Sequence, residues 1–231
     1  MKQSRKPEDN PASAIAETDE IAQVKVWLLG VSPLVWRRVL VPASCTLREL
    51  HGVFQIAMGW EGIHLYQFSL RAARYGSSEL SAFSPDVTLA ALRLRKGTRF
   101  LYEYNLNIPW RHEVRIEDRL APQTNTPRCA GGAGACPPEN CGSPAEFMAR
   151  RDEALSWSAL EDLGTMEDII GQVALERRPD ILDDEETRWR LEQALERAQA
   201  RERAQGTPFS RRSVNDRLRQ GEHREFMHQR Y

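Results

Sequence analysis

Residues 45–60 read CTLRELHGVFQIAMGW and decide where the chain places its first helix. Thr46 and Glu49 have the spacing of a capping box, in which each side chain binds the backbone N–H of the other residue. Apolar residues recur behind this cap at helical intervals, and Gly59 can end the helix in a left-handed conformation. We therefore expect a helix that begins at Leu47.

Segments with the alternation of strands lie on both sides of this helix. Before it, residues 23–30 and 34–42 alternate apolar and polar side chains around a short turn, which predicts a hairpin. After it, residues 64–70, 98–106 and 112–118 alternate in the same way, and the last two suggest an antiparallel pair. Hairpin, helix and further strands is the order of a β-grasp, or ubiquitin-like, fold. We expect an α+β domain whose antiparallel or mixed sheet is crossed by one helix.

The composition predicts four parts along the chain. Residues 1–20 are polar and aperiodic, which is typical of a disordered leader. Residues 21–142 are expected to form the β-grasp-like domain, which ends in a loop of cysteine, glycine and proline. Residues 143–220 are expected to form a helical part packed on that domain, and residues 221–231 a basic tail.

The helical part contains signals for the start of a helix. Ser143 with Glu146, and Thr165 with Asp168, have capping-box spacing and predict two helix starts. The buried side of the first helical stretch is expected to come from five apolar residues: Phe147, Met148, Leu155, Leu160 and Leu163.

The overall composition is that of a soluble globular protein. The chain has 231 residues, 41% hydrophobic and 28% charged, with a formal net charge of −1. This balance gives no general attraction to nucleic acid or to a membrane. No apolar run approaches the roughly 18 residues of a membrane-spanning helix, and no signal peptide is evident. We expect a cytoplasmic protein with reduced thiols.

Residues 128–144 read RCAGGAGACPPENCGSP and could form a metal site. The loop contains three cysteines: Cys129, Cys136 and Cys141. Their spacing is wider than the tight pairs of common zinc sites, so a structural zinc would need His112, or alternatively His64, as its fourth ligand. A disulfide and free thiols are the other interpretations, and free thiols are the leading one. Cys45 stands at a hydrophobic-staple position and is expected to be structural.

A second group of residues could line a pocket that stacks a base or binds an anion. Its members are Arg37, Arg38, His51, Trp60, His64, Trp110 and His112. The competing and favoured interpretation is structural. The tryptophans would then be core aromatics, and His51, on the apolar face of its helix, a buried hydrogen-bonding histidine. No catalytic triad can be assigned from the sequence.

The last segment, residues 209–231, is rich in arginine with interleaved aromatic residues. The arginines are Arg211, Arg212, Arg217, Arg219, Arg224 and Arg230. Such a pattern could contact nucleic acid. Asp216, Glu222 and Glu225 dilute its charge, so helix packing and a solvated tail are the favoured interpretation.

Several of these segments together resemble one family. Residues 32–68, 102–118, 127–142 and 209–220 are similar, in that order, to the plasmid pRiA4b ORF-3-like family, whose members are often found on plasmids and insertion elements. The resemblance extends over roughly residues 21–220 and implies an α+β domain. Relatives are commonly labelled insertion-element passenger proteins of a TnpR type, which implies resolvase chemistry. A serine recombinase needs a nucleophilic serine set among arginines, and this chain shows no such arrangement.

The chain departs from the family pattern at one place. The family typically has an aspartate where this chain has Asn105, and another where it has Ile108, just before the Trp-x-His of Trp110 and His112. If those carboxylates bind metal or transfer protons in relatives, this protein has lost that function, because neither replacement titrates near neutral pH.

These observations favour a non-catalytic accessory or interaction protein of the mobile-element type, with another protein as its partner and no membrane partner. One alternative is a metal-dependent DNA-processing or hydrolytic enzyme that uses His64 and His112. A second is a DNA-binding protein that uses the basic C-terminal segment.

Overall fold

A computed structural model of the chain describes residues 20–77, 79–121, 126–153 and 156–227. The chain forms two compact units. The first combines Met1–Leu29, Leu34–Gly134 and Phe209–Tyr231, and the second combines Gly30–Pro33 and Ala135–Pro208. Residues 209–220, expected in the helical part, therefore belong to the same unit as the sheet. The leader expected at residues 1–20 lies outside the described residues except for Glu20.

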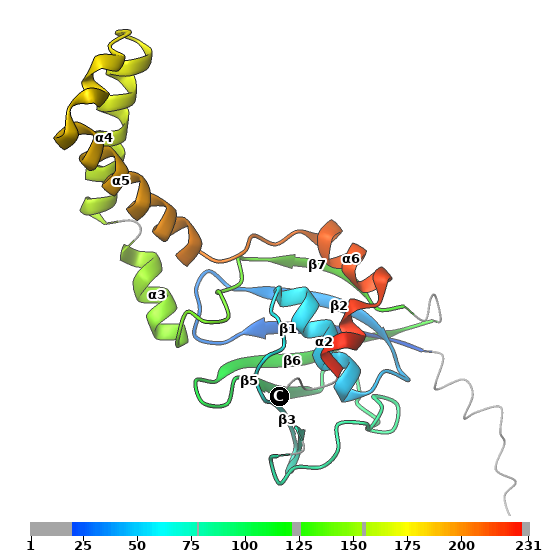
Figure 1. The fold of residues 1–231 in the computed structure, drawn as a ribbon. Coiled ribbons are helices and arrows are strands. Elements are labelled where there is room, and N and C mark those ends of the chain that lie inside the picture. Colours follow the sequence, from blue (N-terminus) through cyan, green and yellow to red (C-terminus); the bar gives the residue numbers. More distant parts are fainter. Residues whose placement is uncertain (1–19, 78, 122–125, 154–155, 228–231) are drawn as a thin grey trace, which may run out of the picture. The chain divides into compact units, whose positions relative to one another are not determined.

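The first unit is built on a seven-stranded sheet (Figure 1). Its strands are β1 (Ile21–Leu28), β2 (Trp36–Pro42), β3 (Tyr66–Leu70), β4 (Ala73–Gly76), β5 (Arg99–Tyr104), β6 (Trp110–Leu120) and β7 (Arg128–Ala133). They are arranged in the order β4-β3-β5-β6-β1-β2-β7. Every pair of these strands is antiparallel. The α+β class is confirmed, but the β-grasp is not, because a ubiquitin-like sheet has a parallel central pair and β1 is antiparallel to both of its neighbours.

The strands with clear alternation occur where the sequence predicts them. β1 and β2 form the expected hairpin, in which Trp27 lies opposite Trp36. β5 and β6 form the expected antiparallel pair. Two strands have no counterpart in the sequence prediction: β4 is only four residues long, and β7 lies in the glycine-rich stretch expected to be a loop.

Helix α2 (Leu47–Met58) crosses one face of this sheet (Figure 1). The Thr46 hydroxyl accepts the N–H of Glu49, and the Glu49 carboxylate accepts the N–H of Thr46, so the predicted capping box is confirmed. Gly59 ends the helix with φ 85°, as expected. Ten of its twelve residues are buried, which means that α2 is covered on more than the side facing the sheet.

The cover on the other side of α2 comes from the C-terminal segment. Helix α6 (Arg211–Gln220) packs on β7 and contacts α2, and the short 3-10 helix η2 (Glu222–Met227) packs along α2. Gly52 permits this approach, because a Cβ at that position would lie 2.0 Å from the carbonyl oxygen of His223. The predicted basic tail is thus largely a packed segment, and only its residues 228–231 lie outside the described part of the chain.

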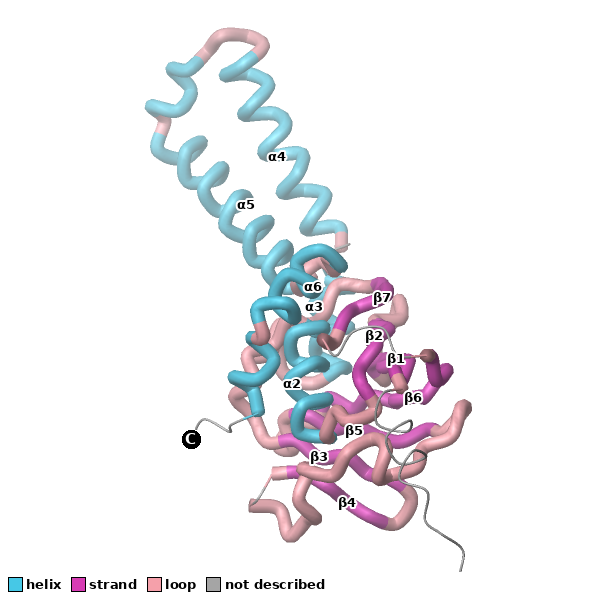
Figure 2. Tube along the Cα trace, turned by 90° about the vertical axis from the view of Figure 1, so that its right-hand side faces the viewer, coloured by secondary structure: helices cyan, strands magenta, loops and turns pink. Residues whose placement is uncertain are grey.

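The second unit is helical. It contains α3 (Pro144–Glu153), α4 (Trp157–Ala174), the 3-10 helix η1 (Pro179–Asp183) and α5 (Glu185–Ala204). Figure 2 shows α4 and α5 running side by side, and they are in contact. Asp162 of α4 accepts hydrogen bonds from Arg197, at 2.6 Å, and from Arg201 of α5. None of the described helices is long and apolar enough to span a bilayer.

Predictions for this unit have mixed outcomes. The Ser143–Glu146 capping box is confirmed at the start of α3. The predicted start at Thr165 is wrong, because its hydroxyl donates back to the Glu161 carbonyl and α4 continues through it. Of the apolar residues expected to be buried, Phe147 is buried. Met148 is half-buried, Leu160 and Leu163 are more than half exposed, and Leu155 lies outside the described residues.

Candidate functional site

Helix α2 brings two polar side chains to the hydroxyl of Tyr102 on β5. His51 Nδ1 lies 2.8 Å from this hydroxyl, and Gln55 Nε2 donates to it at 2.8 Å. Burial, aided by the charge of Arg48, lowers the pKa of His51 to about 3. The ring is therefore neutral at neutral pH, with one nitrogen that carries a proton and one that can accept a hydrogen bond. His51 also stacks on Tyr66, with 3.7 Å between ring centroids.

The predicted pocket is partly assembled around Tyr104. Its ring centroid lies 5.1 Å from that of Trp60 and 5.6 Å from that of His64. Trp60 in turn lies 6.0 Å from Trp110 and 5.3 Å from His112. The structure thus brings together five of the seven predicted residues: His51, Trp60, His64, Trp110 and His112. They form an aromatic cluster between α2 and the sheet, here called the buried aromatic cluster, in which four residues are buried and His64 is half-buried.

Proton transfer from this cluster to a substrate is disfavoured. His112 is fully buried, and burial lowers its pKa to about 4, although backbone hydrogen bonds at Tyr102 and Trp110 oppose the shift. Within this cluster, three buried ring nitrogens have no hydrogen-bond partner among the described residues: His64 Nε2, Trp110 Nε1 and His112 Nε2. A neutral imidazole without solvent exposure is a poor general acid or base at neutral pH, so the geometry favours a core role.

The two arginines expected in the same pocket lie elsewhere. The Arg37 side chain is buried and donates to four backbone carbonyls, those of Trp36, Ala57, Ala133 and Gly134, at 2.8–3.1 Å. Its guanidinium carbon also lies 4.3 Å from the ring centroid of Phe209. Arg38, the next residue along the strand, instead forms an ion pair with Glu117 and lowers the pKa of that carboxyl. Arg37 therefore links the last turn of α2 to carbonyls at the start of β2 and the end of β7. Arg38 forms its ion pair on the surface of the sheet.

Arg37 and Phe209 explain one of the two glycines of β7, Gly132. A Cβ at Gly132 would lie 2.8 Å from Arg37 Cδ and 2.9 Å from Phe209 Cζ. A residue without a side chain is therefore required where the buried arginine passes under the edge strand. From the sequence, the glycines of this stretch were compatible with a loop around a metal ion or with an ordinary irregular loop, and neither interpretation predicts a strand.

The predicted zinc ligands are not brought together. His112 on β6 and Cys129 on β7 are separated by β1 and β2, so they lie at least about 14 Å apart at the usual strand spacing. Within the part of the chain that the structure describes, no three His, Cys, Asp or Glu residues gather as metal ligands. Cys45, Cys129, Cys136 and Cys141 are buried free thiols. Burial raises the pKa of Cys129 and Cys141, which disfavours thiolate chemistry.

The backbone conformation at residue 105 explains why the family typically has aspartate there and this chain has asparagine. This residue lies in the β5–β6 turn with φ 58°, a left-handed conformation that asparagine and aspartate tolerate better than most residues. Its N–H donates to the carbonyl of Leu65, and its carbonyl accepts the N–H of Ile108. An aspartate would serve this turn equally well, so the position does not by itself indicate lost chemistry.

The arginines of the C-terminal segment are partly neutralised. Arg217 pairs with Glu222 at 2.6 Å, and Asp216 pairs with both Arg219 and Arg212. The aromatic residues are also engaged: Phe209 covers Arg37, and Phe226 packs against Gly62. Arg230 and Tyr231 lie outside the described residues. This arrangement favours packing over the stacking platform that single-stranded nucleic acid needs.

Two features were missed by sequence reasoning. The first is an apolar stripe on α4, here called the outer stripe, formed by Trp157, Leu160, Leu163 and Ile170, which are 53–83% exposed. The sequence analysis named two of these residues, Leu160 and Leu163, and wrongly expected both to be buried.

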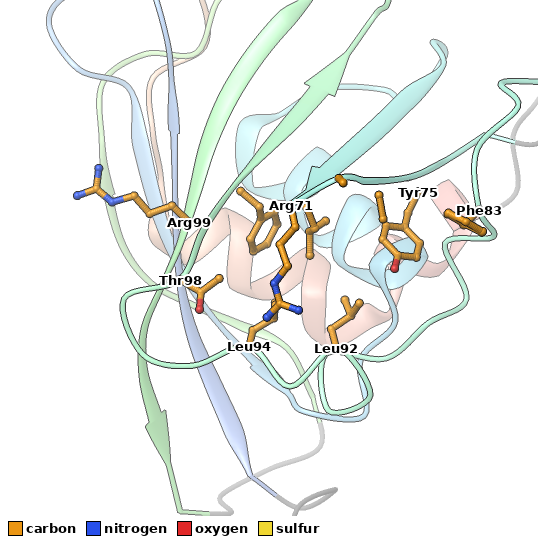
Figure 3. A pocket seen from close by; sticks show the side chains of 11 residues that line it. Arg71, Tyr75, Phe83, Leu92, Leu94, Thr98 and Arg99 are labelled. Carbon is orange, nitrogen blue, oxygen red and sulfur yellow. The ribbon is translucent and has the colours of Figure 1, made fainter.

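The second is a surface pocket of about 330 Å³ beside the β3–β4 turn (Figure 3). It is lined by Leu70, Arg71, Ala72, Ala73, Tyr75, Phe83, Leu92, Leu94, Thr98, Arg99 and Phe100. Its residues come from three separate segments, so no local pattern could reveal it.

Comparison with known proteins supports the resemblance seen in the sequence. The family described as "Plasmid pRiA4b ORF-3-like protein" matches residues 20–172. The chain belongs to the plasmid pRiA4b ORF-3-like family. The match covers the sheet, α2, α3 and most of α4. It ends well before residue 220, so the C-terminal segment lies beyond it.

One relative and one solved structure extend the comparison. The "Uncharacterized protein y4hQ" of Sinorhizobium fredii is 33% identical over 161 residues, which cover 62% of this chain and 82% of that protein. A crystal structure of a protein of unknown function, MM3350 from Methanosarcina mazei Go1, matches with a TM-score of 0.56 at 24% identity. That match covers 62% of this chain and 86% of the other, and it supports the fold alone.

Proposed function

We propose that this pRiA4b ORF-3-like protein is a non-catalytic interaction protein whose α4 helix binds a basic amphipathic helix of a protein partner. The observation that carries the proposal is that α4 is apolar on two sides, and the described part of the chain covers only one of them. The plasmid in the family's name is consistent with an accessory role on mobile DNA.

The covered side of α4 faces α5. Ala159 and Ile169 are 8% and 3% exposed, and α5 is the main neighbour of α4. Leu160 lies about 180° around the helix from Ile169, because nine residues span two and a half turns. The outer stripe spans about 140° of the helix circumference and is therefore a second face. A helix that is apolar on both sides is typical of one packed between two neighbours.

The charges of α4 indicate the chemistry of the missing neighbour. The helix carries four acidic residues and no basic one. Asp162 is used by the arginines of α5. Glu161, Glu167 and Asp168 form no ion pair within the described residues, and Glu167 lies inside the outer stripe. An apolar face flanked by carboxylates that form no ion pair suits an amphipathic helix with lysine or arginine beside its apolar residues.

A binding titration of the full-length protein tests the proposal. The probe is a fluorescent lysine–leucine peptide with helical amphipathic spacing, as long as α4, and the control peptide has the same composition in a shuffled order. We expect the amphipathic peptide to bind at least about tenfold more tightly. The double variant Leu160→Gln/Leu163→Gln should lose this preference, whereas Leu195→Gln, on α5, should retain it.

Equal binding of both peptides, or undiminished binding by the double variant, would overturn the proposal. Analytical ultracentrifugation of the free protein tests whether a second copy of the chain, instead of a partner, occupies the outer stripe. If the chain dimerises and the double variant abolishes the dimer, the outer stripe is a self-association surface and the proposed partner is wrong.

A further inference from the structure

The pocket beside the β3–β4 turn has a buried apolar floor. Leu70, Leu94 and Phe100 are 6%, 4% and 5% exposed, and each contributes to its lining. The volume of about 330 Å³ lies at the lower end of the range for small-molecule sites. All lining residues belong to the first unit. The pocket is therefore a property of a single compact body.

Two aromatic rings form one wall. Tyr75 and Phe83 have ring centroids 5.8 Å apart and an interplanar angle of 42°. Phe83 is 65% exposed, yet its backbone is fixed, because its N–H donates to Arg74 and its carbonyl accepts the N–H of Gly76. A large exposed ring held in place beside an apolar floor is suited to stacking a flat ligand.

Arg71 supplies a cation at the mouth of this pocket. Figure 3 shows its side chain extending across the pocket toward the loop of Leu92 and Leu94, whereas Arg99 points away. Arg99 is held by Glu113 at 2.8 Å. Arg71 has no ion pair or hydrogen bond to its side chain among the described residues.

The backbone at Arg71 makes this residue an unexpected choice. Its φ is 55°, in the left-handed region that glycine and asparagine occupy most readily. An arginine in this conformation is mildly strained, and such strain is often retained where the side chain has a task. Arg71 is therefore a less favourable residue for this turn than glycine, but it places a positive charge above an apolar cavity.

From this arrangement we infer that the pocket binds a small arylcarboxylate. The aromatic body would stack on Tyr75 and Phe83 over the apolar floor, and the carboxylate would pair with the Arg71 guanidinium. Thr98 offers one hydroxyl nearby. One guanidinium and one hydroxyl suit a monoanion better than a phosphate, which needs more donors. This inference does not depend on the function proposed for α4.

Calorimetric titration of the full-length protein tests the inference. The probe is naphthalene-2-carboxylate, and its neutral counterpart is 2-naphthamide, which has the same ring system. We expect the acid to bind at least about tenfold more tightly than the amide. Arg71→Gly should remove this preference without loss of stability, because glycine suits the positive φ. Arg71→Lys should keep part of it.

Arg177→Gly is the matched control, because Arg177 has the same φ of 55° and lies in the other unit. It should leave binding unchanged. Equal affinity for acid and amide, undiminished binding by Arg71→Gly, or no binding at about 1 mM ligand would overturn the inference. Amide chemical-shift changes must also centre on Tyr75 and Phe83, and changes confined to other residues would reject this pocket.

Discussion

Helices α2 and α4 both carry apolar residues on more than one side, yet their surroundings differ. Ten of the twelve residues of α2 are buried, compared with three of the eighteen in α4. The sheet covers one side of α2, and η2 and α6 cover another. α4 has α5 as its main neighbour. An apolar helix needs as many neighbours as it has apolar faces, and only α2 finds enough of them within the described chain.

The largest expected effect is in the core of the first unit. Phe54→Ala should lower the free energy of unfolding by about 3–5 kcal/mol, because the fully buried ring leaves a cavity. Leu160→Ala in the outer stripe should change it by less than about 0.5 kcal/mol. Urea denaturation of both variants measures the difference. A comparable loss in both would mean that Leu160 is covered and would remove the contrast between the helices.

The histidines should make the first unit sensitive to acid. His51 and His112 have folded-state pKa values of about 3 and about 4, below the ordinary value of 6.5. Below pH 6.5 the unfolded chain therefore binds protons that the folded chain does not, and stability falls as the pH falls. The loss is roughly 1.4 kcal/mol per pH unit for each histidine until the folded pKa is reached.

The second unit contains no histidine, so α4 and α5 should not share this sensitivity. Hydrogen exchange at pH 7 and pH 5, corrected for intrinsic rates, separates the two units. Protection that falls equally in α2 and α5 would contradict the assignment of the acid response to the buried aromatic cluster.

Adjacent arginines on β2 offer a third contrast. Arg37→Met should lower the free energy of unfolding by about 2–3 kcal/mol, because buried carbonyls lose their donors. Arg38→Met removes a partly exposed ion pair and should cost at most about 1 kcal/mol. Thermal denaturation of the two variants compares their losses of stability. A larger loss in Arg38→Met would show that Arg37 does not hold α2 and the strand ends together.

Two glycines, one on each helix, should give effects of opposite sign. Gly52→Ala in α2 should destabilise the protein by about 1–3 kcal/mol, because its Cβ would clash with the His223 carbonyl. At Gly164 in α4 an added Cβ would face open space, so Gly164→Ala should stabilise the helix by about 0.5–1 kcal/mol. Limited proteolysis should detect release of η2 only in the first variant. Destabilisation by Gly164→Ala would indicate that the outer side of α4 is already occupied.

The candidate sites were less predictable than the strands. The residues expected in one pocket separated into a buried aromatic cluster and two arginines with different tasks. Alternation along β2 already places Arg37 and Arg38 on opposite faces. It does not show that Arg37 faces inward, because that depends on carbonyls nearly 100 residues away.

The local elements follow from the sequence alone: the start of α2 at its capping box, its end at Gly59 and the alternating strands of the hairpin. These depend on hydrogen bonds and side-chain spacing within a few residues. The pairing of the glycine-rich cysteine stretch with β2, and the packing of the C-terminal segment on α2, become visible only in the folded chain. So does the exposure of the outer stripe. Each depends on surfaces contributed by distant parts of the chain, which local patterns do not encode.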